Sequence, residues 1–117
     1  MMKNSSWLST MIAAGCLILA PAALAAEAGD PVAGKRKNSM CAGCHGISGY
    51  KTVFPDTYHV PKLGGQHAAY IVKALQEYKA GNRSHPTMRA IAAALSDKDM
   101  ADLAAYYASG STQAAAK

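Results

Sequence analysis

Phe and Trp are scarce in this chain of 117 residues, which contains one of each. Charged residues make up only 16% of it, which excludes a disordered protein kept open by its charge. The length allows one domain and excludes an enzyme with separate cofactor and substrate lobes. Because much of the apolar half is alanine, few large side chains are available to build a core, and something else has to fill the interior.

Cysteine and acidic residues are scarce as well. The three cysteines would leave one thiol over in any set of disulfides, and 12 Lys and Arg outnumber 7 Asp and Glu, for a formal charge of +5. Nucleic-acid binding is one explanation of such a basic chain. However, no recognition motif and no interleaving of basic and aromatic residues accompanies the charge, so we expect no nucleic-acid partner.

The amino-terminal segment has the features of an export signal. It starts with the positive charge of Lys3, continues with apolar and small residues, and reaches Ala-Leu-Ala at residues 23–25. This pattern predicts a secretory signal peptide over residues 1–25 and export to a bacterial periplasm. The alternative is an uncleaved transmembrane anchor. Pro21 and the alanines keep the strongly apolar part below the roughly 20 residues of a membrane span, which favours cleavage, and we expect no stable membrane insertion after it.

Lipid attachment at Cys16, after three small residues, is a minor alternative, because the apolar run before it is short and a second cleavage signal follows. After cleavage, we expect a folded domain over residues 26–109 and a flexible tail over residues 110–117. The mature chain would keep eleven basic residues, seven acidic residues and two cysteines. Two cysteines in an exported protein normally suggest one disulfide, but their spacing indicates another use.

Residues 41–45 read Cys-Ala-Gly-Cys-His, and C-x-x-C-H is the attachment signature of c-type haem. Two thiols three residues apart on a helix project to the same side, where Cys41 and Cys44 can add to the two vinyl groups of one haem. His45 then stands where its imidazole can bind the iron. A thioredoxin-like pair needs a strand–helix context, and a zinc site needs two further close ligands. The sequence has neither, so the motif predicts haem c.

The mature chain has helical periodicity and no β pattern. A helix capped by Asp30 is expected to continue through the haem motif to Gly46. Residues 47–65 have no sustained period, and we expect one long loop that could wrap a haem. Three further helices are expected: over residues 66–80, around residues 88–95, and after a capping box at residues 96–99.

Each predicted helix also has an expected inward face. In the first helix, the inward residues are Val32, Ala33, Met40 and Cys41. In the helix over residues 66–80, they are Tyr70, Ile71, Ala74, Leu75 and Tyr78. In the last helix, they are Met100, Leu103, Ala104 and Tyr107.

The chain resembles the class I c-type cytochromes, small bacterial proteins that occur singly and as modules of dihaem cytochromes c. The resemblance covers about residues 29–109. It rests on the haem motif and on shorter segments in the family's order, at residues 34–35, 61–66, 81–83 and 95–109. It implies an all-α cytochrome c fold, with about four helices around one covalently bound haem, and transfer of one electron.

The resemblance also implies a second iron ligand. Met88 stands 43 residues after His45, at a place similar to that of the family's axial methionine. Its neutral thioether would stabilise the reduced iron. His85, His59 and an open site are the alternatives, while Met100 lies on an inner helix stripe, where a methionine is usually part of the core.

A ligating imidazole usually donates its other N–H to a fixed acceptor. In the family, this acceptor is a proline carbonyl in the loop after the haem motif. Pro61 matches that proline, and Pro55 is the rival.

Three other residues have roles that the resemblance leaves open. Gly34 resembles the small residue at which the first and last helices cross, near Tyr106 or Tyr107. Gln66 and Arg83 could donate hydrogen bonds to the haem propionates, or could equally lie in solvent.

Lysines and arginines are spread along the mature chain, beginning with residues 35–37 before the haem motif. A basic rim around a haem edge would steer redox proteins with acidic docking surfaces, such as an oxidase, a reductase or a dehydrogenase. We favour a diffusible electron carrier. The alternatives are a cytochrome subunit permanently docked to a larger oxidoreductase and an open-site haem protein that binds a small ligand. No catalytic cluster is evident, so we expect no enzyme.

Overall fold

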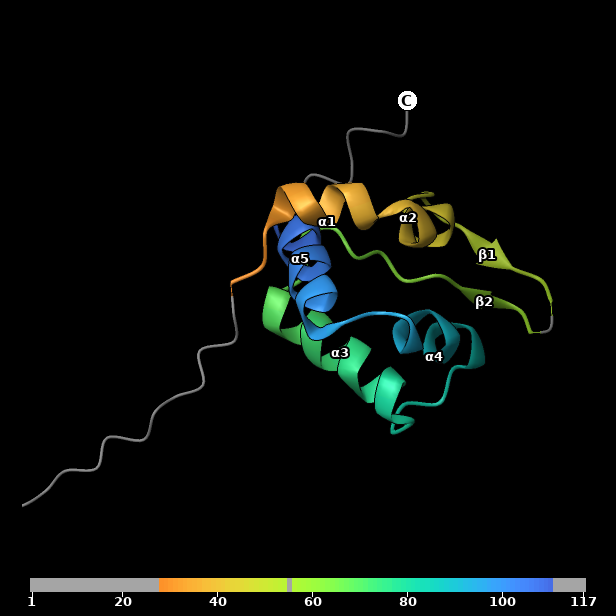
Figure 1. The fold of residues 1–117 in the computed structure, drawn as a ribbon. Helices are drawn as coiled ribbons and strands as arrows, with labels where there is room; N and C mark the ends of the chain where they lie inside the picture. Colours follow the sequence, from red (N-terminus) through yellow and green to blue (C-terminus); the bar gives the residue numbers. More distant parts are fainter. Residues whose placement is uncertain (1–27, 55, 111–117) are drawn as a thin grey trace, which may run out of the picture.

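The computed structural model describes residues 28–54 and 56–110. The predicted signal peptide, Cys16, Pro55 and residues 111–117 of the predicted tail lie outside the described residues. Figure 1 shows the order of the elements, which are α1 (Pro31–Lys37), α2 (Ser39–His45), β1 (Lys51–Thr52), β2 (Tyr58–His59), α3 (Ala68–Ala80), α4 (Pro86–Ala93) and α5 (Asp97–Ala108). The predicted all-α class is confirmed. None of these helices is long and apolar enough to cross a membrane.

The first predicted helix is divided in two at Asn38, so the prediction of one continuous helix is wrong. The N–H of Asn38 donates to the carbonyl of Lys35 at the end of α1, and its own carbonyl accepts from Cys41 and Ala42 at the start of α2. The Asn38 side chain accepts a hydrogen bond from the hydroxyl of Tyr107. Asparagine favours turns and caps, and this distant partner holds it in such a turn.

The segment 47–65, predicted as one loop without strands, contains a short antiparallel hairpin of β1 and β2, with Thr52 opposite Tyr58. The hydroxyl of Thr52 donates to the carbonyl of Asp56 at 2.9 Å and closes the turn between the strands. Two paired residues in each strand are too few to produce an alternating pattern, which is why the sequence shows none.

The other helix boundaries differ from prediction by about one half-turn. α3 begins at Ala68 rather than residue 66 and ends before Gly81, which adopts φ +84 as the C-cap. α4 begins at Pro86, two residues earlier than expected, because proline suits the first turn and His85 caps it. The predicted capping box between Ser96 and Asp99 is confirmed at the start of α5.

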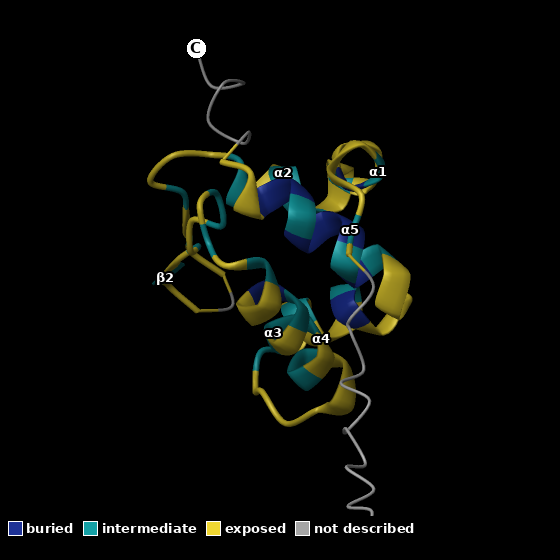
Figure 2. Ribbon diagram, turned by 90° about the vertical axis from the view of Figure 1, so that its left-hand side faces the viewer, coloured by how far each residue is buried: buried dark blue, intermediate teal, exposed yellow. Residues whose placement is uncertain are grey.

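The core of the described residues lies on α5 and the helices beside it. Met100, Leu103, Ala104, Tyr106 and Tyr107 of α5 are all buried. Ile71 of α3 and Ala92 of α4 are the buried apolar side chains on the neighbouring helices. Figure 2 shows this concentration as dark blue along α5, while the hairpin is mostly exposed. The inward face predicted for the last helix is therefore confirmed.

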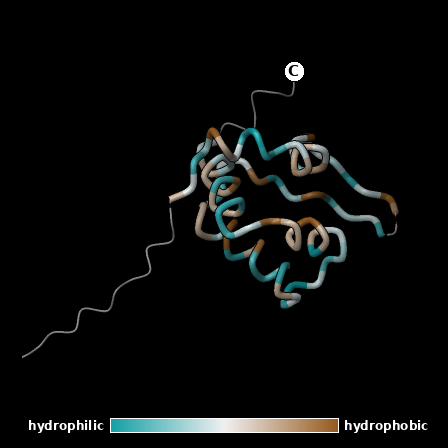
Figure 3. Tube along the Cα trace, viewed as in Figure 1, coloured by the Kyte–Doolittle hydropathy of each residue, from teal (hydrophilic) through white to brown (hydrophobic). Residues whose placement is uncertain are grey.

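Several residues that we predicted to face inward are exposed instead: Val32, Met40 and Tyr70 are 61%, 60% and 54% exposed. The inward face of α1 is set by Gly34, and Val32, two positions earlier, falls on the opposite side of the helix. Figure 3 adds a hydrophobic, brown segment at the end of the hairpin, where Val53 and Phe54 are also exposed.

α1 and α5 cross with their backbones in contact, and Gly34 makes this possible. A Cβ on Gly34 would lie 2.1 Å from the carbonyl oxygen of Asp102 and 2.8 Å from the Cβ of Tyr106. Any side chain would therefore push the helices apart. The prediction that Gly34 lies at the crossing of the first and last helices is confirmed.

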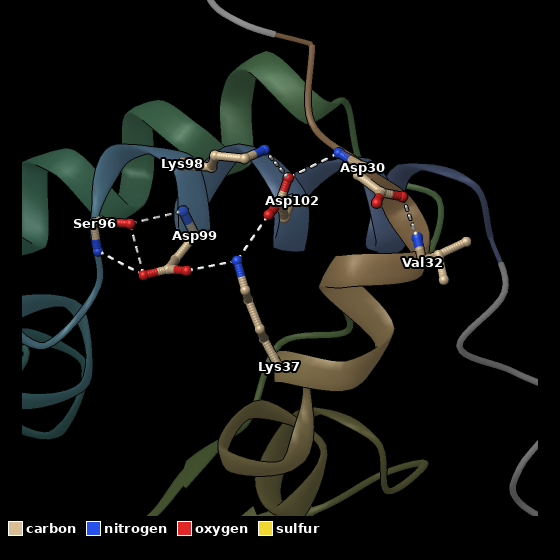
Figure 4. A network of polar contacts seen from close by, with 7 residues as sticks. All are labelled: Asp30, Val32, Lys37, Ser96, Lys98, Asp99 and Asp102. Carbon is tan, nitrogen blue, oxygen red and sulfur yellow. Dashed lines mark hydrogen bonds and ion pairs between the residues drawn. The ribbon is translucent and has the colours of Figure 1, made fainter.

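A polar network ties the same two helices together (Figure 4). The fully buried carboxylate of Asp102 accepts hydrogen bonds from Lys37 Nζ at 2.8 Å, from the N–H of Asp30 at 2.8 Å and from Lys98 Nζ at 3.2 Å. The bond from Lys37, followed by that from Asp30, lowers the pKa of Asp102 to about 2. The carboxylate therefore stays charged in the interior because three donors surround it.

Lys37 also forms an ion pair with Asp99, 2.6 Å away. Asp99 accepts from the hydroxyl and the N–H of Ser96 as well, at 2.7 and 2.9 Å. The Lys37 ammonium, more than the bonds from Ser96, holds the pKa of Asp99 well below its usual range. Lys37 thus joins α1 to both carboxylates of α5, and these partners raise its own pKa.

Candidate functional site

The three residues of the C-x-x-C-H motif lie on one short helix, α2. Cys41 and Cys44 are free cysteines in the structure, and their sulfur atoms are those that would form thioethers. Cys41 is half-buried and packs against a core cluster that consists of Ile71, Ala104, Tyr106 and Tyr107, whereas Cys44 is exposed. Burial raises the pKa of the Cys41 thiol, and a hydrogen bond with Tyr107 opposes that shift in part. Of the two cysteines of α2, one therefore contacts the core and the other is at the surface.

The imidazole of His45 is held by a backbone carbonyl. Its Nδ1 lies 2.6 Å from the carbonyl oxygen of Pro61. Because a carbonyl oxygen only accepts, Nδ1 carries a proton and donates it, and in the neutral imidazole Nε2 keeps a free lone pair. A metal-binding histidine has this arrangement, in which one nitrogen is fixed by an acceptor and the other is available.

The segment that contains Pro61 is in turn fixed to α5. The N–H of Gly65 donates to the carbonyl of Tyr107 at 2.9 Å, and the N–H of Gln66 donates to that of Leu63 at 3.1 Å. Gly65 has φ +83, in the left-handed region that favours glycine, and Leu63 packs against the core cluster. These contacts fix the position of the carbonyl that His45 uses.

Tyr107 is a positioning residue that we predicted only as part of the core. Its hydroxyl donates to Asn38 at the start of α2, and its carbonyl accepts from Gly65 in the segment that follows Pro61. Burial raises the pKa of Tyr107, so the hydroxyl remains a neutral donor. A buried tyrosine usually has a hydrogen-bond partner, and this is the one signal in the sequence that could have indicated the role.

Met88 lies on the first turn of α4 and is half-buried. Its N–H donates to Nδ1 of His85 at 3.2 Å, so His85 caps the helix. The His85 ring also contacts the rings of Tyr58 and Tyr78 edge to face, with centroids 5.0 and 6.3 Å apart. The structure thus gives His85 a local role, while His59 is exposed on β2. In Figure 1, α2 and α4 lie at the same end of the molecule, together with the hairpin.

The two candidate propionate donors each have a local contact. The side-chain oxygen of Gln66 accepts from the N–H of His67 at 2.9 Å, next to the start of α3. The guanidinium of Arg83 lies over the ring of Tyr78, 4.6 Å from its centroid.

The donor set fits haem c. Two cysteine sulfurs on one helix supply the two covalent attachments, and His45 Nε2 and the Met88 thioether are ligands of the kind that cytochromes use. The half-buried apolar side chains of Leu63, Val72 and Leu75 lie against the core cluster and could border such a group.

Comparison with known proteins identifies the family. The model of the family described as cytochrome c matches residues 31–111, which is more than half of the chain. The chain belongs to the cytochrome c family. This confirms the resemblance to class I c-type cytochromes, whose members bind haem c covalently and transfer electrons.

Two curated relatives and one solved structure illustrate the match. Cytochrome c4 of Pseudomonas aeruginosa is 40% identical over 93 residues, which cover 80% of this chain and 44% of that protein. Cytochrome c-554(548) of Halomonas halodenitrificans is 40% identical over 85 residues, covering 70% of this chain and 98% of that one. The crystal structure of reduced recombinant cytochrome c4 from Pseudomonas stutzeri superposes with a TM-score of 0.51 at 34% identity.

That superposition covers 68% of this chain and 49% of the cytochrome c4 chain. The chain therefore spans about half the length of its cytochrome c4 relatives, which agrees with its resemblance to one module of a dihaem cytochrome.

Proposed function

We propose that this protein is a periplasmic electron carrier that binds one haem c through Cys41 and Cys44, with His45 and Met88 as the iron ligands. When bound, haem c supplies an iron that gains and loses one electron. The observation that carries the proposal is the hydrogen bond from His45 Nδ1 to the carbonyl of Pro61, directly beside the two cysteines of α2. That bond leaves Nε2 free to bind iron.

The residues of this chain have distinct roles in the proposal. The Pro61 carbonyl selects the tautomer of His45 and fixes the orientation of its ring. It also makes the unprotonated Nε2 a stronger electron-pair donor to the iron. The neutral thioether of Met88 favours the reduced state and therefore a higher potential. Tyr107 holds both the start of α2 and the segment after Pro61, so one residue of α5 contacts the two segments that carry His45 and its acceptor.

The charges support a partner with an acidic docking surface. Lys37, Lys73 and Lys98 are paired with carboxylates of this chain. By contrast, the exposed Lys51 and Lys62 have no carboxylate partner among the described residues, and Lys62 directly follows Pro61. These unpaired cations, on β1 and next to Pro61, would steer an acidic redox protein toward the site. The association rate would fall as the ionic strength rises.

Export and covalent attachment are tested together by producing the full-length chain in a bacterium that attaches haem c in its periplasm. We expect the protein in the periplasmic fraction, with haem that remains on the polypeptide in a denaturing gel. The double variant Cys41→Ala/Cys44→Ala should lack this covalently bound haem. A redox titration of the purified protein should follow a one-electron Nernst curve. A wild-type protein from that host without covalent haem would contradict the proposal.

Two other outcomes distinguish the alternatives. A haem protein that elutes from the native extract only within a much larger complex would indicate a docked cytochrome subunit instead of a free carrier. A high-spin spectrum of the untouched oxidised protein would indicate an open-site haem protein that binds a small ligand.

A further inference from the structure

A hollow of about 490 Å³ lies between α4 and the connection from α3 to α4. Arg83 and Ser84 of the connection line one wall, and Arg89 of α4 lines another. No Asp or Glu contributes to its lining. The hollow is therefore a basic site that the proposed electron transfer does not use.

This hollow lies on the outer side of α4, away from the face that carries Met88. Its lining from α4 includes Pro86, Arg89 and Ala93, which are spaced by three and four residues and are all exposed. Met88 and Ala92 lie on another face of the same helix, where Ala92 is fully buried in the core. The side chain of Met88 therefore lies on a different face of α4 from the residues of that helix that line the hollow.

Both guanidinium groups are positioned by contacts with this chain. Arg83 lies over the ring of Tyr78, with 4.6 Å between its Cζ and the ring centroid. Arg89 reaches across to Gly81, so that its Cζ would be 3.5 Å from a Cβ at that position. Stacking on an aromatic ring limits the freedom of a guanidinium and reduces the entropy lost on binding a ligand.

Neither arginine has a carboxylate partner among residues 28–54 and 56–110. Two positive charges in one hollow repel each other unless an anion lies between them. Guanidinium groups bind oxyanions through paired N–H donors, and the hydroxyl of Ser84 offers one further donor in the same lining. The combination of two cations and a hydroxyl suits a divalent oxyanion better than a single carboxylate.

We propose that this hollow binds a small divalent oxyanion, such as sulfate or phosphate, between Arg83 and Arg89. The site goes beyond the proposed electron transfer, because the α4 residues that line it are on a different face of the helix from the Met88 side chain, and the ring of His85, which also lines it, bonds to Met88 only through its backbone N–H. It gives the protein a second ligand, one whose binding does not depend on the haem ligands.

The test uses the purified haem protein labelled with ¹⁵N. Sodium sulfate or phosphate is titrated at constant ionic strength, with chloride as the replaced anion, and amide shifts are followed. We expect saturable shifts confined to about residues 81–90, and at least tenfold weaker binding in Arg83→Gln and in Arg89→Gln. The matched control is Arg36→Gln, which removes the same charge from the exposed surface of α1 and should leave the binding constant unchanged.

Circular dichroism of each variant checks that the fold is retained, and Arg83→Lys provides a second variant that keeps the charge. The proposal is overturned if chloride produces the same shifts, if Arg36→Gln weakens binding as much as Arg89→Gln, or if an acidic peptide binds there and sulfate does not. Failure of the proposed electron transfer would instead appear in the absorption spectrum, which this titration does not use.

Discussion

The crossing of α1 and α5 and the segment from α2 to the start of α3 are held in different ways. At the crossing, the backbones touch at Gly34, and the buried Asp102 accepts three hydrogen bonds. In the other region, none of the described residues between 39 and 67 is buried. This region is attached to α5 by hydrogen bonds such as that from Gly65 to Tyr107 and by the half-buried Cys41 and Leu63, while the bond between His45 and Pro61 lies within it. The packing of the chain stabilises the first region, whereas the second holds the residues proposed to bind the cofactor.

The largest expected effect is at the crossing. Gly34→Val would place side-chain atoms within the space of the α5 backbone, and a Cβ alone would lie 2.1 Å from a carbonyl oxygen. We expect the free energy of unfolding in guanidinium chloride to fall by about 3 kcal/mol or more. The control is Gly43→Ala on α2, where nothing lies within 4 Å and the change should be neutral or slightly stabilising. Equal stability of the two variants would show that the crossing is not tight.

The acid sensitivity of the crossing should depend on Asp102. Its pKa is lowered from 3.8 to about 2, chiefly by Lys37, so its stabilising contribution is present above about pH 4. That contribution is lost as the pH falls through about 2. We expect Asp102→Asn to be less stable at pH 7 and to lose less stability between pH 4 and pH 2 than the wild type.

The thermal midpoint measured across this pH range gives the profile. Asp97→Asn, on the exposed first turn of the same helix, is the control and should retain the wild-type slope. An unchanged slope in Asp102→Asn would mean that the network does not cause the acid sensitivity. Asp99, whose pKa is also lowered by Lys37, accounts for the part of the slope that remains.

A smaller effect is expected where the two regions meet. Tyr107→Phe removes the hydroxyl that holds Asn38 and leaves the carbonyl that holds Gly65. We expect unfolding to become easier by about 1 kcal/mol, and amide exchange to become faster mainly in α2. Tyr70→Phe on the exposed side of α3 is the control, and it should change neither quantity. Faster exchange spread evenly over α1 and α5 would argue against this coupling.

The smallest effect is expected at Pro61. Pro61→Ala keeps the carbonyl that accepts from His45 and changes only the stiffness of the backbone. We expect a loss of less than about 1 kcal/mol in the free energy of unfolding. A much larger loss would show that the proline ring itself, and not its carbonyl, fixes this region.

The sequence predicted local features well. The capping box at Ser96, the inward position of Met100 and the glycine at the crossing each follow from a pattern of a few residues or from the family's motif. The division at Asn38 could not be predicted, because it involves a hydroxyl 69 residues away. The same holds for the bond between Asp30 and Asp102, which are 72 residues apart.

The candidate site shows the same limit. The motif predicted the haem-binding residues and the resemblance suggested Pro61, but neither indicated that Tyr107 contacts both the start of α2 and the segment after Pro61. The resemblance suggests Arg83 as a propionate donor, but its place beside Arg89 depends on how the connection from α3 to α4 folds against α4. Residues that act through distant partners leave no regular spacing in a sequence.

The proposed ligation of the iron by Met88 is tested most directly by the near-infrared spectrum of the oxidised haem protein. Ligation by a methionine sulfur gives a weak sulfur-to-iron charge-transfer band. We predict this band in the wild type and in Met40→Ala, whose side chain is exposed, and its loss in Met88→Ala. A band that persists in Met88→Ala, or a high-spin wild-type spectrum without it, would contradict the account.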